Sequence, residues 1–218
     1  MAEKEKISIE RELASIAVLS NEKERVERLS KIFEKTLEEG NREEIKKVGE
    51  ILLRKLDQVI KETITDTKKE LSSASIGARF ILSVTKTLEA EGVAYGIEKA
   101  MESMNYLTEL IKFKEKISSK NEEEPIVKHT KDAIESTIEN VRAELGFAQE
   151  NLAIIYYNNR SIANSREFQL LDKIINVAFE NVNYLNDWMK LKDRVEKEVK
   201  AEEKQEKLSI RELFDELI

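Results

Sequence analysis

The sequence contains no cysteine, a single proline and only six glycines in 218 residues. The lack of cysteine excludes disulfides, thiolate nucleophiles and cysteine-ligated metals. So few turn-forming residues argue against every β-rich fold, because short strands need a turn after each one. The chain has one histidine, His129, so two-histidine zinc motifs and the paired Glu-x-x-His ligands of helical di-iron sites are also excluded.

Long apolar runs and a strong basic excess are missing as well. No run approaches the roughly 18 apolar residues of a transmembrane helix, and the first five residues carry both signs of charge, unlike a signal peptide. We therefore expect a cytoplasmic protein. The net charge is −7, with 22 basic and 23 acidic residues up to Ser118 and 15 and 21 after it. Because neutralisation of phosphates drives duplex binding, this balance disfavours nucleic acid as a partner.

Charged residues make up 37% of the chain and hydrophobic residues 40%, while aromatics reach only 6%. The apolar residues recur at three- and four-residue steps, which places them on one face of long helices. The sequence predicts an all-α fold of long antiparallel helical hairpins packed as a bundle at coiled-coil-like angles. The heavy use of Lys and Glu is typical of thermophile proteins, and a long solvated bundle explains it equally well.

Breaks between the helices are predicted from glycine, asparagine, serine and proline. The polar stretch before Pro125 is the best linker, with the proline in the first turn of the next helix. The domains expected are residues 1–118, a linker over 119–125, residues 126–204 and a C-terminal segment over 205–218. Other predicted breaks are Ser20-Asn21, Gly40-Asn41, a kink or loop at Gly92 and Gly96, and Asn158 to Ser161; residues 72–75 are either a turn or small residues inside one helix.

Two segments resemble each other at an offset of 78 residues. The segment from Ala100 to Leu107 matches the segment from Ala178 to Leu185, and both contain the triplet Asn-Tyr-Leu. One interpretation is a duplication that relates two halves of the chain. The other is chance similarity between amphipathic helices of biased composition. Asn105 and Asn183 are either buried polar groups that fix helix register or residues at the edge of the core.

Residues for catalysis are scarce. His129 stands beside a lysine and is most simply a solvated helix residue. Glu89 with Glu91, or Asp66 with Glu70, are candidates for carboxylate metal ligands, although solvated ion pairs at helical spacing explain them too. No phosphate-binding loop, dinucleotide fingerprint or nucleophile elbow is present. We therefore assign no catalytic, cofactor-binding or metal-binding residue.

The last eleven residues differ from the charged stretch before them. Ser209 and Glu212 have the spacing of a capping box, followed by apolar residues at the spacing of one helix face. A helix this short is unstable alone, so it must dock on a partner or on its own bundle. The predicted partner-binding residues are Ile210, Leu213, Phe214, Leu217 and Ile218.

Two families resemble parts of the chain. The stretch from Arg79 to Lys86, with Leu88, Glu89 and Gly92, resembles part of the third helix of PhoU-type phosphate-signalling regulators. That resemblance implies two three-helix repeats and a divalent metal held by carboxylates. Val93 stands where the family's acidic pattern would help, which leaves the metal site incomplete.

Membrane-remodelling proteins of the ESCRT-III type are the second family. Gly40-Asn41 is similar to their hairpin turn, Lys99 to Asn105 to a segment after their long second helix, and the C-terminal segment to their partner-binding tail. The resemblance implies a filament subunit that acts on anionic membranes. Residues 1–118 are nearly neutral, whereas the hairpin of that family is usually basic.

From these features we expect a non-enzymatic helical scaffold or adaptor. It would self-associate or bind a protein partner through helical faces and the C-terminal segment. An ESCRT-III-like filament subunit that contacts membrane surfaces and a PhoU-like metal regulator are the alternatives.

Overall fold

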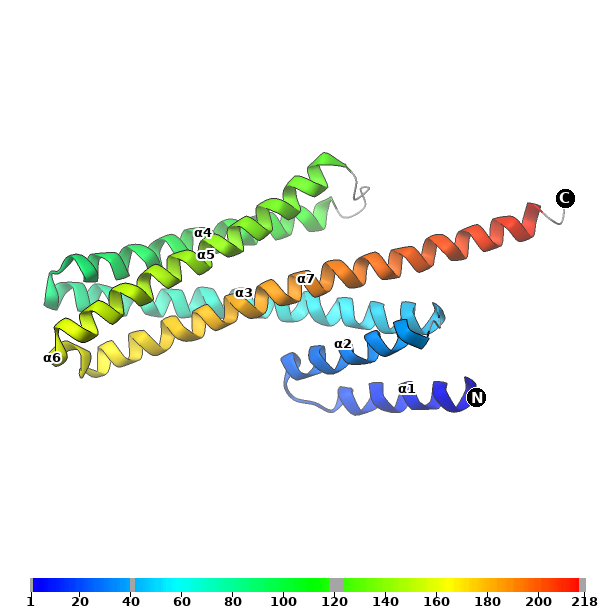
Figure 1. The fold of residues 1–218 in the computed structure, drawn as a ribbon, viewed down its shortest axis with the longest axis horizontal. Helices are drawn as coiled ribbons and strands as arrows, with labels where there is room; N and C mark the ends of the chain where they lie inside the picture. The colour runs from blue at the N-terminus through cyan, green and yellow to red at the C-terminus, as the bar shows by residue number, and fades with distance from the viewer. Residues whose placement is uncertain (1, 40–41, 118–123, 216–218) are drawn as a thin grey trace. The chain divides into compact units, whose positions relative to one another are not determined.

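The structure, a computed structural model, describes residues 2–39, 42–117 and 124–215, and every element in these ranges is a helix (Figure 1). This confirms the predicted all-α class of long helices packed against each other. The helices in the described ranges are α1 (Ala2–Ala17), α2 (Glu22–Glu39), α3 (Arg42–Thr85), α4 (Leu88–Lys116), α5 (Pro125–Asn158), α6 (Arg160–Ala163) and α7 (Arg166–Asp215).

None of these helices is both long enough and apolar enough to pass through a lipid bilayer, as far as the described residues extend.

The contacts divide the chain into two compact units. Unit 1 consists of Met1–Lys61 and Asp187–Ile218, and unit 2 consists of Glu62–Asn186. Both boundaries fall inside a helix, so α3 and α7 each contribute to both units. The predicted domains follow the order of the chain, whereas these units combine segments from its two ends. The two divisions differ because helices as long as α3 and α7 have different neighbours along their length.

Unit 1 buries an apolar core contributed by α1, α2 and parts of α3 and α7. Gly49 of α3 lies against Val199 of α7 and Phe33 of α2, and a Cβ atom at Gly49 would overlap the Val199 side chain. Phe33 is fully buried and Val199 nearly so. Glycine at this position therefore allows three helices to approach closely.

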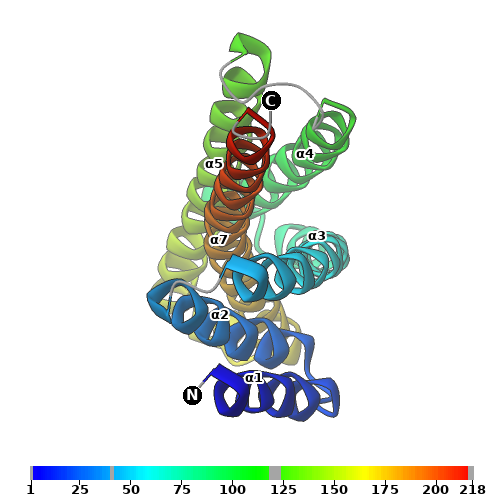
Figure 2. The ribbon, with the colours of Figure 1, turned by 90° about the vertical axis from the view of Figure 1, so that its right-hand side faces the viewer.

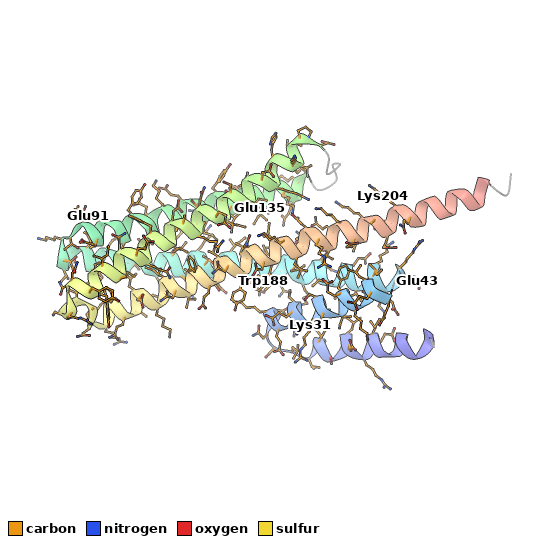
Figure 3. All side chains as sticks on the ribbon, viewed as in Figure 1. Lys31, Glu43, Glu91, Glu135, Trp188 and Lys204 are labelled. Carbon is orange, nitrogen blue, oxygen red and sulfur yellow. The ribbon has the colours of Figure 1, made fainter. Side chains whose placement is uncertain are left out.

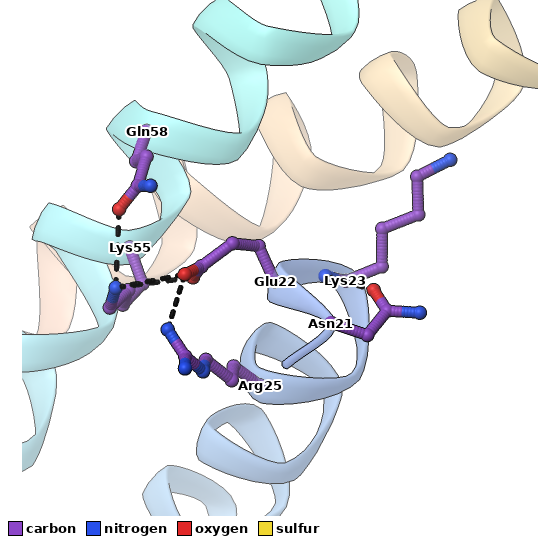
Figure 4. Close-up of polar contacts among 6 residues, drawn as sticks. All are labelled: Asn21, Glu22, Lys23, Arg25, Lys55 and Gln58. Carbon is purple, nitrogen blue, oxygen red and sulfur yellow. Dashed lines mark hydrogen bonds and ion pairs between the residues drawn. The ribbon is translucent and has the colours of Figure 1, made fainter. Parts of the chain in front are cut away.

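Ion pairs add to this packing. Glu22 at the start of α2 accepts a hydrogen bond of 3.1 Å from Lys55 of α3, which also donates one to Gln58 (Figure 4). Arg194 of α7 pairs with Glu34 of α2 at 2.7 Å. Partly exposed pairs of this kind contribute at most about 1 kcal/mol each, so apolar burial remains the larger stabilising effect.

Unit 2 is formed by the second part of α3, by α4, α5 and α6, and by the first part of α7 (Figure 2). Ser103 of α4 donates a hydrogen bond of 3.2 Å to Glu144 of α5. On the other flank of α5, Gln149 donates one of 2.6 Å to Asn176 of α7. Thus α5 has α4 on one side and α7 on the other.

The bundle of unit 2 is completed by α3. Gly77 of α3 lies against Leu171 of α7, where a Cβ atom on the glycine would be 3.3 Å from the leucine side chain. A two-residue connection, Lys86 and Thr87, joins α3 to α4. The neighbours in order are therefore α3, α4, α5 and α7, so that the α4/α5 pair and the α3/α7 pair form opposite sides of unit 2.

The predicted break at Gly92 and Gly96 is wrong, because α4 runs through both glycines. The chain reverses earlier, at Lys86, whose φ of 51° lies in the left-handed region. Thr87 then caps α4 by accepting a hydrogen bond of 3.3 Å from the amide of Ala90. Gly96 instead permits close helix packing, since a Cβ atom there would be 2.7 Å from the backbone oxygen of Glu144.

Other predicted boundaries are confirmed. Asn21 accepts a hydrogen bond of 2.9 Å from the amide of Lys23 at the start of α2. Pro125 is the first residue of α5, and Asn159 separates α5 from α6. The serines at residues 72–75 lie inside the continuous helix α3, which decides between the two alternatives for this stretch.

Some predictions fall on residues outside the described ranges. The turn at Gly40-Asn41 and residues 118–123 of the linker region are among them. Helix α7 continues through Ser209 to Asp215, so the separate helix predicted to start there is the end of α7. The side chains beyond Gln205 are not described, and the partner-binding role of residues 210–218 stays a prediction.

Candidate protein-interaction surface

Exposed apolar side chains are concentrated in unit 2. Among the side chains that the structure describes, sixteen large apolar residues are exposed, and Val18 alone belongs to unit 1. A folded protein exposes single apolar residues routinely, but a contiguous set marks an interaction surface. The question is whether the fifteen residues of unit 2 are scattered or aligned.

One aligned set lies along the α3/α7 pair. Ile76, Phe80 and Val84 are spaced four residues apart on α3, and Ile76 is 73% exposed. Phe80 and Val84 are three and seven residues beyond Gly77, on the side of α3 that meets α7. These three residues therefore follow one edge of the α3/α7 contact.

The matching residues on α7 are spaced seven residues apart. Leu170, Val177 and Tyr184 are all exposed and share one helix face. Asn176 faces α5, and Val177 lies 100° further round the helix, away from α5 and toward α3. We call the surface of Ile76, Phe80, Val84, Leu170, Val177 and Tyr184 the α3/α7 face.

A second aligned set lies along the α4/α5 pair. It begins at a shallow groove of about 370 Å³ between the two helices, which holds Glu102 and Tyr106 of α4 and Asn140 of α5. The complete lining is Glu102, Ser103, Tyr106, Ala133, Ser136, Thr137 and Asn140.

Steps of seven residues extend this groove along both helices. From Glu102 they lead back to Tyr95 and Leu88 on α4, and from Asn140 they lead forward to Phe147 and Ile154 on α5. All four of these apolar residues are exposed. Residues seven apart lie on one helix face, so the four continue the face that holds the groove.

The register of the two helices brings these residues opposite one another. A Cβ atom on Gly92 would touch Asn151, and one on Gly96 would touch Ala148. Because α4 and α5 are antiparallel, the same register places Tyr95 across from Phe147 and Leu88 across from Ile154. We call the surface of Leu88, Tyr95, Tyr106, Phe147 and Ile154, with Glu102 and Asn140, the α4/α5 face.

The two faces differ in charge. The paired residues 88–111 and 132–157 contain ten acidic and two basic side chains, whereas the rest of the chain contains 34 and 35. These two stretches are therefore strongly acidic, whereas the remaining turns of the two helices, residues 112–116 and 125–131, hold five basic side chains and one acidic. Around the α3/α7 face, residues 62–86 and 166–186 contain six acidic and six basic side chains.

Both cations of residues 88–111 and 132–157 are already engaged. Lys99 pairs with Glu102 at 2.6 Å, and its hydrogen bond and charge interaction with that carboxylate raise the pKa of Lys99. Arg142 pairs with Glu139 at 2.8 Å. Eight of the ten carboxylates are exposed, and Figure 3 labels one from each helix, Glu91 of α4 and Glu135 of α5.

One carboxylate of this pair is partly buried. Glu144 accepts a hydrogen bond from Ser103 at one oxygen, while its Oε2 atom is buried without a hydrogen-bond partner. Burial raises the pKa of Glu144, and the hydrogen bond from Ser103 and the charge of Lys99 oppose that rise.

The predicted chemical candidates do not come together. His129 is exposed on α5, and Glu91 and Asp66 are exposed on different helices. Within the described ranges, no group of three or more histidine, aspartate or glutamate side chains is placed to hold a metal ion.

The sequence predicted partner binding through helical faces and the C-terminal segment, but it named residues only for the C-terminal segment and none on the two faces of unit 2. Tyr95, Phe147 and Leu170 carry the seven-residue spacing in the sequence. This spacing did not stand out in the sequence, because the buried apolar residues of the same helices recur at similar spacing and are more numerous.

Comparisons of the chain with family models, with curated proteins and with solved structures found no match.

Proposed function

We propose that this protein is a helical scaffold whose copies associate through the α3/α7 face of unit 2. The observation that carries the proposal is the exposure of six aligned apolar side chains on a surface with balanced charge. A homodimer with twofold symmetry brings the same patch of both copies together. A balanced face can do so without repulsion.

The α4/α5 face is unsuited to the same contact. Pairing it with itself would bring together two segments that each carry ten acidic and two basic side chains. Like charges across an interface oppose association. Charge therefore selects the α3/α7 face for contacts between copies.

The apolar content of the α3/α7 face is of the right size. Burying the exposed half of a leucine- or phenylalanine-sized side chain contributes about 1 kcal/mol. Twelve such side chains from two copies are comparable with the cost of association, which is about 4–15 kcal/mol. We expect a dimer of micromolar stability.

The test is the mass of the protein in solution, by light scattering and sedimentation. Wild-type protein is expected at twice the 25.2 kDa of one chain at concentrations near 100 µM, well above a micromolar dissociation constant. The double substitution Phe80→Asp and Val177→Asp should give a single chain, because it places carboxylates in the interface. Both side chains are exposed, so the variant should retain its helical circular dichroism.

A matched control changes the other face. Tyr95→Asp with Phe147→Asp alters two exposed aromatic residues on α4 and α5 and should leave the dimer intact. A wild-type protein that stays at 25.2 kDa would refute the proposal. So would binding of a monomer to phospholipid vesicles that Phe80→Asp and Val177→Asp abolish, since the face would then serve a lipid surface.

The predicted partner-binding residues at the C-terminus form a separate part of the proposal. Val199 is the last buried residue among the described side chains of α7. Deletion of residues 208–218 is therefore expected to change neither the melting temperature nor the dimer. A large fall in melting temperature would show that these residues pack on the bundle and are not held available for a second protein.

A further inference from the structure

We infer that the α4/α5 face binds a cationic amphipathic helix of a second protein. This inference goes beyond self-association, and it uses the opposite pair of helices in unit 2. One proposal can therefore fail while the other holds.

The shape of the face suits a helix. Leu88 with Ile154 and Tyr95 with Phe147 form two apolar pairs, one heptad apart, in the seam between α4 and α5. Seven residues of a helix rise about 10.5 Å, so a helix laid along this seam presents an apolar residue to each pair in turn. An amphipathic helix in a groove is recognised by anchors at this spacing.

The next heptad position of the seam is polar. Glu102 and Asn140 line the groove there, and Tyr106 extends it. A docked helix would place its third anchor at this point, where a lysine or arginine side chain meets carboxylate and amide oxygens. A polar position in an apolar seam fixes the register of the helix that binds.

Charge decides what kind of helix binds. Exposed carboxylates lie on the outer sides of both helices near the seam: Glu91, Glu98, Glu102 and Glu109 on α4, and Asp132, Glu139 and Glu150 on α5. Three of these carboxylates pair with a cation of their own helix: Glu102 with Lys99, Glu109 with Lys112 and Glu139 with Arg142. The acidic excess offered to a partner comes from the other four. Complementary charge favours a helix rich in lysine or arginine and speeds its association.

The same charges exclude the occupants that this chain itself offers. A second copy of the face would repel the first. The C-terminal segment, residues 208–218, contains one basic and three acidic side chains, so it is also a poor match despite its apolar pattern.

One aromatic residue of the seam, Tyr95, already has a cation beside its ring. The ammonium of Lys99 lies 5.8 Å from the centre of the Tyr95 ring. A cation over an aromatic face is stabilised by roughly 0.5–1 kcal/mol at an exposed site and by more when water is excluded. Tyr95 can thus combine apolar contact with recognition of a partner's lysine or arginine.

The probe is a labelled synthetic peptide of about 18 residues, or five helical turns, with leucine at heptad positions a and d and lysine elsewhere. Its affinity for the full-length protein is measured by fluorescence anisotropy at low and high salt. We expect a micromolar dissociation constant that rises about tenfold with Tyr95→Ala and Phe147→Ala together, since aromatic anchors dominate such contacts. Glu98→Gln with Glu150→Gln should weaken binding about threefold and flatten its salt dependence.

The matched control is Phe80→Ala with Val177→Ala, which should leave the affinity unchanged. The monomeric variant Phe80→Asp with Val177→Asp should still bind, which separates this inference from the proposed dimer. Equal binding of a peptide with the leucines scrambled would overturn the inference, because attraction would then be by charge alone. Equal binding of a glutamate-for-lysine peptide or of a peptide of residues 208–218 would overturn it too, as would no binding at all.

Discussion

The α4/α5 face and the α3/α7 face are two sides of the bundle of unit 2, and their helices share the same kind of apolar spacing. Both expose a row of apolar side chains along the seam between two antiparallel helices. Their charges differ: residues 88–111 and 132–157 hold ten acidic and two basic side chains, whereas residues 62–86 and 166–186 hold six of each. The comparison teaches that helix geometry supplies the seam, while the charges beside it decide which partner is accepted.

The two segments that resemble each other at an offset of 78 residues lie on opposite sides of this comparison, one in α4 and one in α7. Ala100, Met104 and Leu107 of α4 are fully buried, and so are their counterparts Ala178, Val182 and Leu185 of α7. Tyr106 and Tyr184 are exposed on their respective faces. The same motif thus serves both faces, and a true duplication of the chain stays a prediction.

The largest effect is expected when the charge difference is removed. Changing Glu91, Glu98, Glu135 and Glu150 to lysine leaves six acidic and six basic side chains in residues 88–111 and 132–157. Both faces then have balanced charge and exposed apolar side chains, on opposite sides of unit 2. Each copy can therefore bind one neighbour at each face, which gives open chains of subunits in place of a closed dimer. Light scattering should show masses well above the dimer, increasing with concentration.

The matching change of these four residues to glutamine leaves a net acidic excess of four, and we expect it to give an intermediate increase. A lysine variant that stays at the wild-type mass would contradict the assignment of charge as the deciding difference.

A smaller effect is expected from substituting the glycines at the α4/α5 and α3/α7 contacts. Gly96→Ala on α4 places its methyl group 2.7 Å from the backbone oxygen of Glu144, and a backbone atom cannot move aside cheaply. Gly77→Ala on α3 meets only the side chain of Leu171, at 3.3 Å. We expect Gly96→Ala to lower the free energy of unfolding by about 2 kcal/mol and Gly77→Ala to change it by less than about 0.5 kcal/mol.

Thermal unfolding followed by circular dichroism measures both, at about 2–4 °C per kcal/mol for a chain of this size. Gly146→Ala is the control for helix propensity. A Cβ atom there has nothing within 4 Å, so this change should stabilise by about 0.5–1 kcal/mol. If Gly96→Ala and Gly77→Ala lowered the free energy of unfolding equally, the α4/α5 and α3/α7 pairs would not differ in how closely their helices approach.

The smallest expected effect concerns Glu144. Because burial raises the pKa of this carboxyl in the folded state, its stabilising contribution is fully present below the unfolded value of 4.5 and is lost as the pH rises through the folded value. Glu144→Gln should therefore raise the melting temperature at pH 7, by about 1 °C, and the gain should vanish near pH 4. Glu150→Gln, exposed on the same helix, controls for the loss of one negative charge. A gain that persists at pH 4 would exclude titration as its cause.

Much of the fold follows from local sequence. The apolar periodicity predicted helices throughout, and caps at Asn21 and Asn159, with Pro125, marked where helices begin. These signals work because each depends on backbone groups within one turn of the residue. The break predicted at Gly92 and Gly96 was wrong because glycine weakens a helix locally but also lets a neighbouring helix approach closely.

The composition and the order of the residues determined that the chain is helical, that its net charge is acidic, and which side chains share a helix face. Only the tertiary structure decided which of those faces are covered. Phe80 and Phe33 both stand on apolar stripes, yet Phe33 is fully buried and Phe80 is 45% exposed. Local sequence specifies a stripe, but its burial depends on what residues far away in the chain bring against it, as α7 does in both units.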